Sequence, residues 1–173
     1  MNNNDRLIRL RYALDIKDLD MVEIFKLGDK EVTIEEVQQM LAKSNNSQPE
    51  ADEEAYKEKE YMKKCDNVTL EAFLNGLIIY KRGRQEAKPG ETKKHKSMIK
   101  NDRSINNVLL KKVKIALSLT SEDMLDILDE AGVYISNSEL SAVLRKEGQR
   151  NYKECGDRYA RNFLKGLALR YRD

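Results

Sequence analysis

Residues 70–83 read LEAFLNGLIIYKRG, and residues 160–172 read ARNFLKGLALRYR. The two stretches share the pattern Phe-Leu-x-Gly-Leu at a separation of 90 residues. Nearer the N-terminus, a separation of 103 residues aligns further pairs in the same order, among them Asn3-Asn4 with Asn106-Asn107, Leu7 with Leu110, Ala13-Leu14 with Ala116-Leu117, and Glu36 with Glu139. Ordered matches with one change of offset indicate an internal duplication, and repeated units usually pack against each other.

The change of offset locates an insertion in the first copy. The two offsets differ by 13 residues (103 − 90), and the extra residues fall within the segment 44–60, SNNSQPEADEEAYKEKE, which is polar and acidic. We therefore predict a first helical repeat over 1–83 with an acidic insertion at 44–60. A basic linker over 84–104 and a second repeat over 105–173 follow.

Each copy has the pattern of helices. Apolar residues recur at spacings of three and four, which is typical of amphipathic helices; examples are Leu7, Leu10 and Leu14, and Leu110, Val113 and Leu117. Thr33-Ile-Glu-Glu36 and Ser136-Asn-Ser-Glu139 have the capping-box spacing of a helix start. Further helices are expected after Asp18 and Thr120. The last helix of each copy is expected over about 66–82, with Gly83 as its C-cap, and over about 157–172. The predicted fold is all-α: two homologous four-helix repeats packed with approximate two-fold pseudosymmetry.

Composition agrees with this class. The chain has 173 residues, of which 40% are hydrophobic and 36% charged, with a net charge of +2. Two prolines and no tryptophan disfavour a β-barrel or sandwich, which needs turn residues and aromatics. The first residues lack a secretory signal, and no apolar run approaches the length of a membrane span. We expect a soluble cytoplasmic protein.

Two residue pairs recur at equivalent positions and are interpreted as structural. Gly76 and Gly166 lie inside the last helix of each copy, where glycine costs about 1 kcal/mol relative to alanine. We expect a crossing helix close enough to exclude a Cβ; the alternative is a ligand approaching that backbone. Cys65 and Cys155 precede the same helices. Such a cysteine is either a small buried hydrophobe or a thiol activated by the helix N-terminus for redox sensing.

Several stretches resemble the YehS-like family, small bacterial proteins built from a tandem helical domain of unknown function. The matching stretches are Arg9-Leu-Arg-Tyr-Ala-Leu-Asp15 with Met21-Val-Glu-Ile24, Phe73-Leu-Asn-Gly-Leu77 through Lys81-Arg-Gly83, Ser138-Glu-Leu-Ser-Ala142 with Arg145-Lys146, and Asn162-Phe-Leu-Lys-Gly-Leu167. The resemblance covers both repeats and implies a two-repeat helical fold. The family has no assigned activity, so it transfers no catalytic residue. The insertion and the linker are longer here than the family pattern.

Catalytic signatures are missing from the sequence. The one histidine, His95, lies within the Lys-rich linker, which disfavours His-based catalytic and metal sites. Phosphate-binding Gly-rich loops and calcium loops are also absent. We expect no catalytic residues, no metal and no cofactor, although a site assembled from distant carboxylates stays open.

Charge is distributed unevenly. Residues 81–103 and residues 145–172 each carry nine basic and three acidic side chains, whereas 122–139 carries six acidic and none basic. The candidate contacts for a polyanion are Arg145, Lys146, Arg150, Lys153, Arg158, Arg161 and Lys165, with Lys93, Lys94 and Lys96 of the linker. Tyr152, Tyr159 and Tyr171 could stack on unpaired bases. Alternatively, these faces are solvated, the tyrosines pack inside, and the acidic segment pairs with the basic one. A helix-turn-helix match over 124–144 is weak.

The sequence therefore favours a binding protein over an enzyme. The predicted role is a non-catalytic adaptor or regulator that meets a macromolecular partner, a protein rather than a nucleic acid, through the groove between repeats or the last helix. The alternative is nucleic-acid binding through the 145–172 face and the 81–103 linker. Because repeats of this size are marginal alone, a homodimer is also open.

Overall fold

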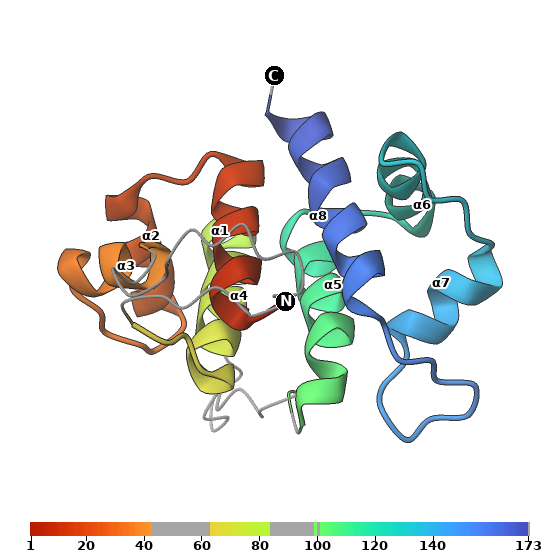
Figure 1. Ribbon diagram of the computed structural model, residues 1–173, viewed down its shortest axis with the longest axis horizontal. Coiled ribbons are helices and arrows are strands. Elements are labelled where there is room, and N and C mark those ends of the chain that lie inside the picture. Colours follow the sequence, from red (N-terminus) through yellow and green to blue (C-terminus); the bar gives the residue numbers. More distant parts are fainter. Residues whose placement is uncertain (43–62, 84–98, 100, 173) are drawn as a thin grey trace, which may run out of the picture.

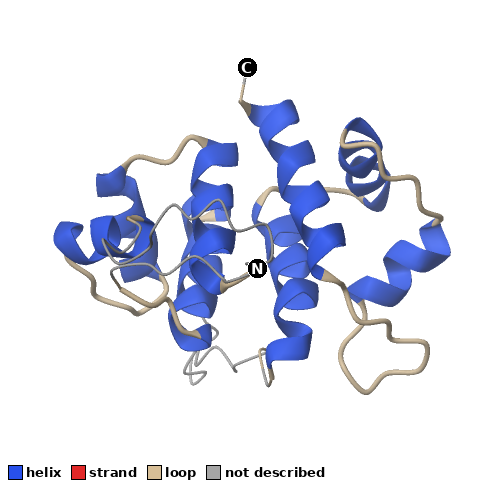
Figure 2. Ribbon diagram, in the orientation of Figure 1, coloured by secondary structure: helices blue, strands red, loops and turns tan. Residues whose placement is uncertain are grey.

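The computed structural model describes residues 1–42, 63–83, 99 and 101–172, and all secondary structure within these residues is helical (Figure 2). The elements are α1 (Asn3–Leu14), α2 (Asp18–Leu27), α3 (Ile34–Leu41), α4 (Asn67–Arg82), the 3-10 helix η1 (Asp102–Ser104), α5 (Ile105–Ala116), α6 (Ser121–Glu130), α7 (Asn137–Leu144) and α8 (Asp157–Tyr171). The prediction of an all-α protein is confirmed.

Helix ends follow the capping residues of the sequence. Thr33 with Glu36 forms a full capping box at the start of α3, and Thr120 with Asp123 forms another at α6. At α7 the Ser136 hydroxyl accepts the Glu139 N–H, which is the hydroxyl half of the predicted box. α2 begins at Asp18 rather than after it, and the Asp18 carboxylate accepts a hydrogen bond from Arg11 (2.6 Å).

Four helices form the centre of the molecule. α1 packs beside α8, and α4 packs beside α5 (Figure 1). On one side of this centre α2 packs on α4, and α3 packs on α2 and α1. On the other side α6 packs on α8, and α7 packs on α6 and α5. The long helices therefore lie inside, and the short ones flank them.

One hydrophobic core runs through all eight α-helices. Its buried members include Leu7 and Phe25 from the first part of the chain and Leu110 and Phe163 from the second. The rings of Phe25 and Phe73 lie 5.2 Å apart where α2 crosses α4. Because both parts contribute to the same cluster, each buries apolar surface that it would expose alone.

The two glycines inside the long helices lie at close backbone contacts. A Cβ at Gly76 would lie 1.7 Å from the carbonyl oxygen of Ile24, so α2 and α4 touch backbone to backbone. A Cβ at Gly166 would lie 2.1 Å from the carbonyl oxygen of Ile127 on α6. The crossing helix, rather than a ligand, occupies the space beside each glycine.

Candidate functional site

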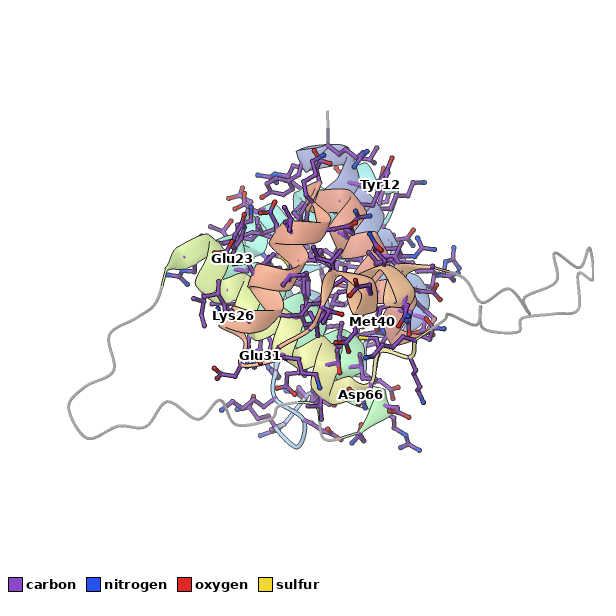
Figure 3. All side chains as sticks on the ribbon, turned by 90° about the vertical axis from the view of Figure 1, so that its left-hand side faces the viewer. Tyr12, Glu23, Lys26, Glu31, Met40 and Asp66 are labelled. Atoms are coloured by element: carbon purple, nitrogen blue, oxygen red, sulfur yellow. The ribbon has the colours of Figure 1, made fainter. Side chains whose placement is uncertain are left out.

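The N-terminal ends of α1, α4, α5 and α8 converge on an open groove of about 1250 Å³. The groove is lined by residues of both parts of the chain, from Met1 and Arg6 to Cys155 and Asp157. Asp66, at the start of α4, marks this end of the molecule, and Tyr12 marks the opposite end (Figure 3). The groove lies where the two parts of the chain meet.

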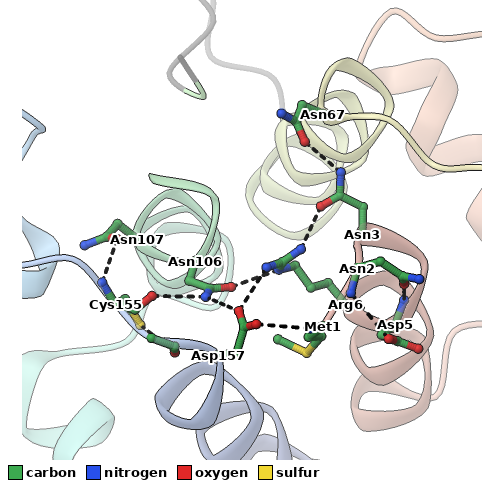
Figure 4. Close-up of polar contacts among 11 residues, drawn as sticks. Met1, Asn2, Asn3, Asp5, Arg6, Asn67, Asn106, Asn107, Cys155 and Asp157 are labelled. Carbon is green, nitrogen blue, oxygen red and sulfur yellow. Dashed lines mark hydrogen bonds and ion pairs between the residues drawn. The ribbon is translucent and has the colours of Figure 1, made fainter. Parts of the chain in front are cut away.

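Arg6 is the centre of the polar network in this groove (Figure 4). Its side chain is buried, and its guanidinium donates to the side-chain oxygens of Asn106 (2.8 Å), Asn3 (2.9 Å) and Asp157 (3.2 Å). Asn106 in turn donates to the Asp157 carboxylate at 2.8 Å. One arginine of α1 therefore joins α5 and α8, which belong to the other part of the chain.

Asp157 stays ionised because of these contacts. Partial burial alone would raise the pKa of its carboxyl, but the hydrogen bonds from the Asn106 amide and the Met1 amine, together with Arg6, lower that pKa below the usual 3.8. The carboxylate accepts from the Met1 amine at 3.0 Å. These donors engage the carboxylate, so it serves to hold the helices together.

Two buried asparagines fasten the chain that precedes α4 and α8. The Asn4 amide donates to the carbonyls of Met40 and Lys63, both at 2.8 Å, and accepts the N–H of Cys65 at 2.9 Å. Asn107 does the same with Val143 (2.9 Å) and Lys153 (2.8 Å), and accepts the Cys155 N–H at 2.9 Å.

The two cysteines lie behind these asparagines and are not activated. Cys65 is 1% exposed and Cys155 is 2% exposed. Burial raises the pKa of each thiol to about 12. Because the thiolate is the reactive form, this environment favours the structural interpretation over redox sensing.

A second polar cluster lies between α4 and α5. Lys112 is buried, and its amine donates to the side-chain oxygen of Asn75 at 2.5 Å and lies 4.0 Å from the Glu71 carboxylate. Burial lowers the pKa of Lys112, and the charge of Glu71 opposes that shift. The backbone N–H of Ile99, itself buried, donates to Glu71 at 3.2 Å. We call Glu71, Asn75 and Lys112 the α4–α5 polar cluster.

The predicted polyanion contacts fall on one helix and the loop before it. Arg158, Arg161 and Lys165 are exposed on α8. In the loop, Lys146, Arg150 and Lys153 are exposed. Arg145 is half-buried and donates to the Arg150 carbonyl at 2.8 Å. The predicted linker contacts Lys93, Lys94 and Lys96, and also His95, lie outside the described residues.

The tyrosines of this region differ in their exposure. Tyr159 is half-buried and packs on the hydrophobic core, and Tyr152 is half-buried as well. Tyr171 is 42% exposed. The acidic segment does pack on the basic helix, since α6 lies against α8 and Arg170 pairs with Asp123 at 3.5 Å.

Sequence reasoning missed both polar networks. The recurrence of Asn3-Asn4 as Asn106-Asn107 was a usable signal for the buried amides. Arg6 gave no such signal, because the 103-residue offset aligns it with Leu109 and not with another arginine. Within the described residues, no group of three or more His, Cys, Asp or Glu side chains is placed to hold a metal ion.

Hydropathy adds one further observation. Among the described helices, none combines the length and the apolar character that crossing a membrane requires.

Comparison with known proteins places the chain in a family. Residues 3–83 and 106–173 match the family described as "Protein of unknown function (DUF1456)". The chain is also similar to the "Uncharacterized protein YehS" of Escherichia coli (strain K12), with 38% identity over 171 residues that cover 98% of this chain and 96% of the relative. No solved structure matches the chain. The match to both halves of the chain and the similarity over nearly its full length show that it belongs to the YehS-like DUF1456 family of proteins of unknown function.

Proposed function

We propose that this protein is a non-catalytic binding or regulatory protein that meets a macromolecular partner through the exposed basic surface of α8 and the 145–156 loop. The proposal rests on the exposure of these basic side chains and on their lack of partners within the described residues. Arg158, Arg161 and Lys165 are exposed, and within the described part of the chain their side chains form no ion pair or hydrogen bond. Unneutralised cations gathered on one element fit a partner of opposite charge.

We further propose that the chain is built as two four-helix repeats related by an approximate two-fold axis. Repeated contacts support this proposal: α2 packs on α4 as α6 packs on α8, and α1 pairs with α8 as α5 pairs with α4. The hydrogen bonds of Asn4 and Asn107 support it as well, because the two residues bind equivalent carbonyls and cysteine N–H groups.

The saturated groove supports a role without catalysis. Arg6, Asn106 and Asp157 line the groove but bond to one another, so these polar groups already have partners within the protein. General acid–base or nucleophilic chemistry needs a group that can reach a reacting atom. The proposal therefore assigns the groove a structural task and places binding on the basic surface.

The test is affinity capture from the native cell with the wild type and two variants, each of which carries two charge reversals. Arg150→Glu with Arg158→Glu removes two exposed cations of the basic surface. Lys17→Glu with Lys26→Glu makes the same charge change on α2 and at its N-cap residue. Lys26 lies on the side covered by α2 and α3 (Figure 3). We expect one protein to be enriched by the wild type and the α2 variant but lost by the first variant. Equal recovery by all three chains refutes the assignment of this surface.

Nucleic acid is the second candidate partner, favoured by the excess of basic over acidic residues in 145–172. Lys and Arg that neutralise phosphates release counterions, so such binding weakens steeply with salt. A titration of generic RNA and DNA at increasing salt tests this alternative. Binding at low salt that falls steeply supports it, and no binding at low salt refutes it.

A further inference from the structure

The α1–α8 pair carries three cations at the positions where the α4–α5 pair holds its polar cluster. With the offsets of the sequence repeat, Lys112 corresponds to Arg9 (112 − 103), Glu71 to Arg161 (71 + 90) and Asn75 to Lys165 (75 + 90). The three members of the α4–α5 polar cluster are 5–7% exposed. Their three counterparts are all exposed and all positively charged. We call Arg9, Arg161 and Lys165 the α1–α8 cationic surface.

Contacts at both ends of α1 and α8 place the two helices that carry these cations side by side. The helices run parallel (Figure 1), since Arg6 pairs with Asp157 near their N-terminal ends and Arg172 donates to the Tyr12 carbonyl at 3.0 Å near their C-terminal ends. Arg9 lies on the same face as Arg6 and about 4.5 Å further along α1. Arg161 lies on the same face as Asp157 and about 6 Å further along α8, so it is level with Arg9.

These like charges repel one another, and the Asp157 carboxylate, one helical turn before Arg161, is already engaged by Arg6 and the Met1 amine. Within the described residues, no side chain forms an ion pair with Arg9, Arg161 or Lys165. In the α4–α5 polar cluster the corresponding residues attract, because Glu71 and Asn75 both face the Lys112 amine. The α1–α8 pair thus carries repulsive charges where the equivalent α4–α5 pair carries attractive ones. Repulsion that opposes folding is typical of a surface kept for binding.

The α4–α5 pair also shows what kind of chain fits such a surface. The backbone N–H of Ile99 donates to the Glu71 carboxylate, and Ile99 is 8% exposed, so the main chain at Ile99 lies against that cluster. At the α1–α8 surface the acceptors are replaced by cations, so a segment lying there would have to supply carboxylates. One face of the neighbouring Tyr12 ring is already covered by Arg172, whose guanidinium lies 4.0 Å from the ring centre, so less aromatic surface is left for the bases of a nucleic acid.

We propose that the α1–α8 cationic surface is the docking site for an extended acidic segment of a partner polypeptide, with Arg9, Arg161 and Lys165 pairing with its carboxylates. Side chains two residues apart on an extended chain point the same way and lie about 6.6 Å apart, which matches the roughly 6 Å rise between Arg161 and Lys165. This inference rests on the proposed function, because it names the partner class and the residues of that surface.

The binding test uses a fluorescein-labelled (Glu-Ser)₅ peptide, with (Gln-Ser)₅ as the uncharged control, and measures fluorescence anisotropy at low salt. Replacing the three cations together (Arg9→Gln, Arg161→Gln and Lys165→Gln) is expected to weaken binding of (Glu-Ser)₅ about tenfold or more. The matched variant with Lys17→Gln, Lys26→Gln and Arg82→Gln loses the same charge elsewhere and is expected to stay within about twofold of the wild type. Equal affinity of the wild type and the first variant overturns the inference.

A stability measurement tests the same surface without a ligand. Lys165→Glu replaces one of the three cations with a carboxylate two helical turns away from Asp157, so we expect its melting temperature to rise at low salt and the rise to shrink as salt is added. An unchanged or lower melting temperature at low salt means that the three cations are not neighbours and overturns the inference.

Two outcomes separate this inference from the proposed function. If an oligothymidylate of equal charge binds through these residues and (Glu-Ser)₅ does not, the acidic polypeptide is refuted while the nucleic-acid candidate gains support. If neither probe binds but the partner captured from cells is still lost by the Arg150→Glu and Arg158→Glu variant, the α1–α8 site is wrong and the basic surface stands.

Discussion

Replacing Gly76 with alanine tests the backbone contact between α2 and α4. The added Cβ would lie 1.7 Å from the Ile24 carbonyl oxygen and 3.0 Å from the Gly28 nitrogen, whereas ordinary van der Waals contact begins at 3.4 Å. Both neighbours are backbone atoms, so neither can rotate away as a flexible side chain would. The two helices must separate, and the packing of Phe25 on Phe73 loosens with them.

The expected magnitude is the balance of two terms. Overpacking of this kind costs about 1–3 kcal/mol, and a clash between two backbones lies at the upper end of that range. Alanine gains about 1 kcal/mol over glycine inside a helix. We therefore expect Gly76→Ala to lower the free energy of unfolding by about 2 kcal/mol. Without the close contact, the same substitution would raise it by about 1 kcal/mol. The sign of the change decides the question.

Urea unfolding followed by far-UV circular dichroism measures this change. Gly166→Ala, whose Cβ would lie 2.1 Å from the Ile127 carbonyl oxygen, should behave in the same way. Gly156→Ala is the control, because its Cβ would meet nothing within 4 Å, and it should lose less than about 1 kcal/mol from the weaker cap. A Gly76→Ala variant that unfolds at higher urea than the wild type, with an unchanged slope, would refute the reasoning.

Three further predictions follow from the polar contacts. Asn107→Ala removes two hydrogen bonds to carbonyls and one from the Cys155 N–H, so it should lower the free energy of unfolding by about 3 kcal/mol. Urea unfolding measures this loss, and a loss below about 1 kcal/mol contradicts the role of Asn107. Asp157 has a folded-state pKa below 3.8, so the stability that its carboxylate supplies is present above pH 3.8 and is lost as the pH falls through the folded-state pKa. At neutral pH the wild type should be about 1 kcal/mol more stable than Asp157→Asn, a modest difference because the Asp157 side chain is half exposed. This difference should disappear on acidification, and a difference that stays constant contradicts this account. Cys65 and Cys155, with pKa values of about 12, should react with a thiol reagent at neutral pH only after unfolding, and labelling of the folded chain revives the redox interpretation.

Local sequence was enough to predict the helices, because helix formation depends on residues three and four positions apart. The stripe of Leu7 and Leu10 is buried, and the cap at Thr33 forms as its spacing predicts. Gly83 ends α4 with a φ of 80° and donates its N–H to the Ile79 carbonyl, as expected of a C-cap. Each of these features is complete within about two helical turns, so no knowledge of distant residues was needed.

The candidate surface could be predicted only in part. The cations of 145–172 were visible as a charge excess, and their exposure on α8 follows from the helix period once Phe163 and Leu167 face inward. The place of Arg9 beside this basic helix could not be predicted, because Arg9 lies on α1, far from α8 in the sequence. From the sequence alone Tyr159 could be a stacking residue or a packing residue, and the structure places it against the hydrophobic core.

By itself, then, the sequence determined the helices, their caps and the recurrence of the same residues in two parts of the chain. Only the tertiary structure decided which helices pair: α1 with α8 and α4 with α5. That pairing brings Arg6 to Asp157 and Lys112 to Glu71 across large separations in the chain, while it leaves Arg9 and Arg161 exposed. The physical reason is that an ion pair depends on distance in space, and a single sequence fixes distances only along one helix.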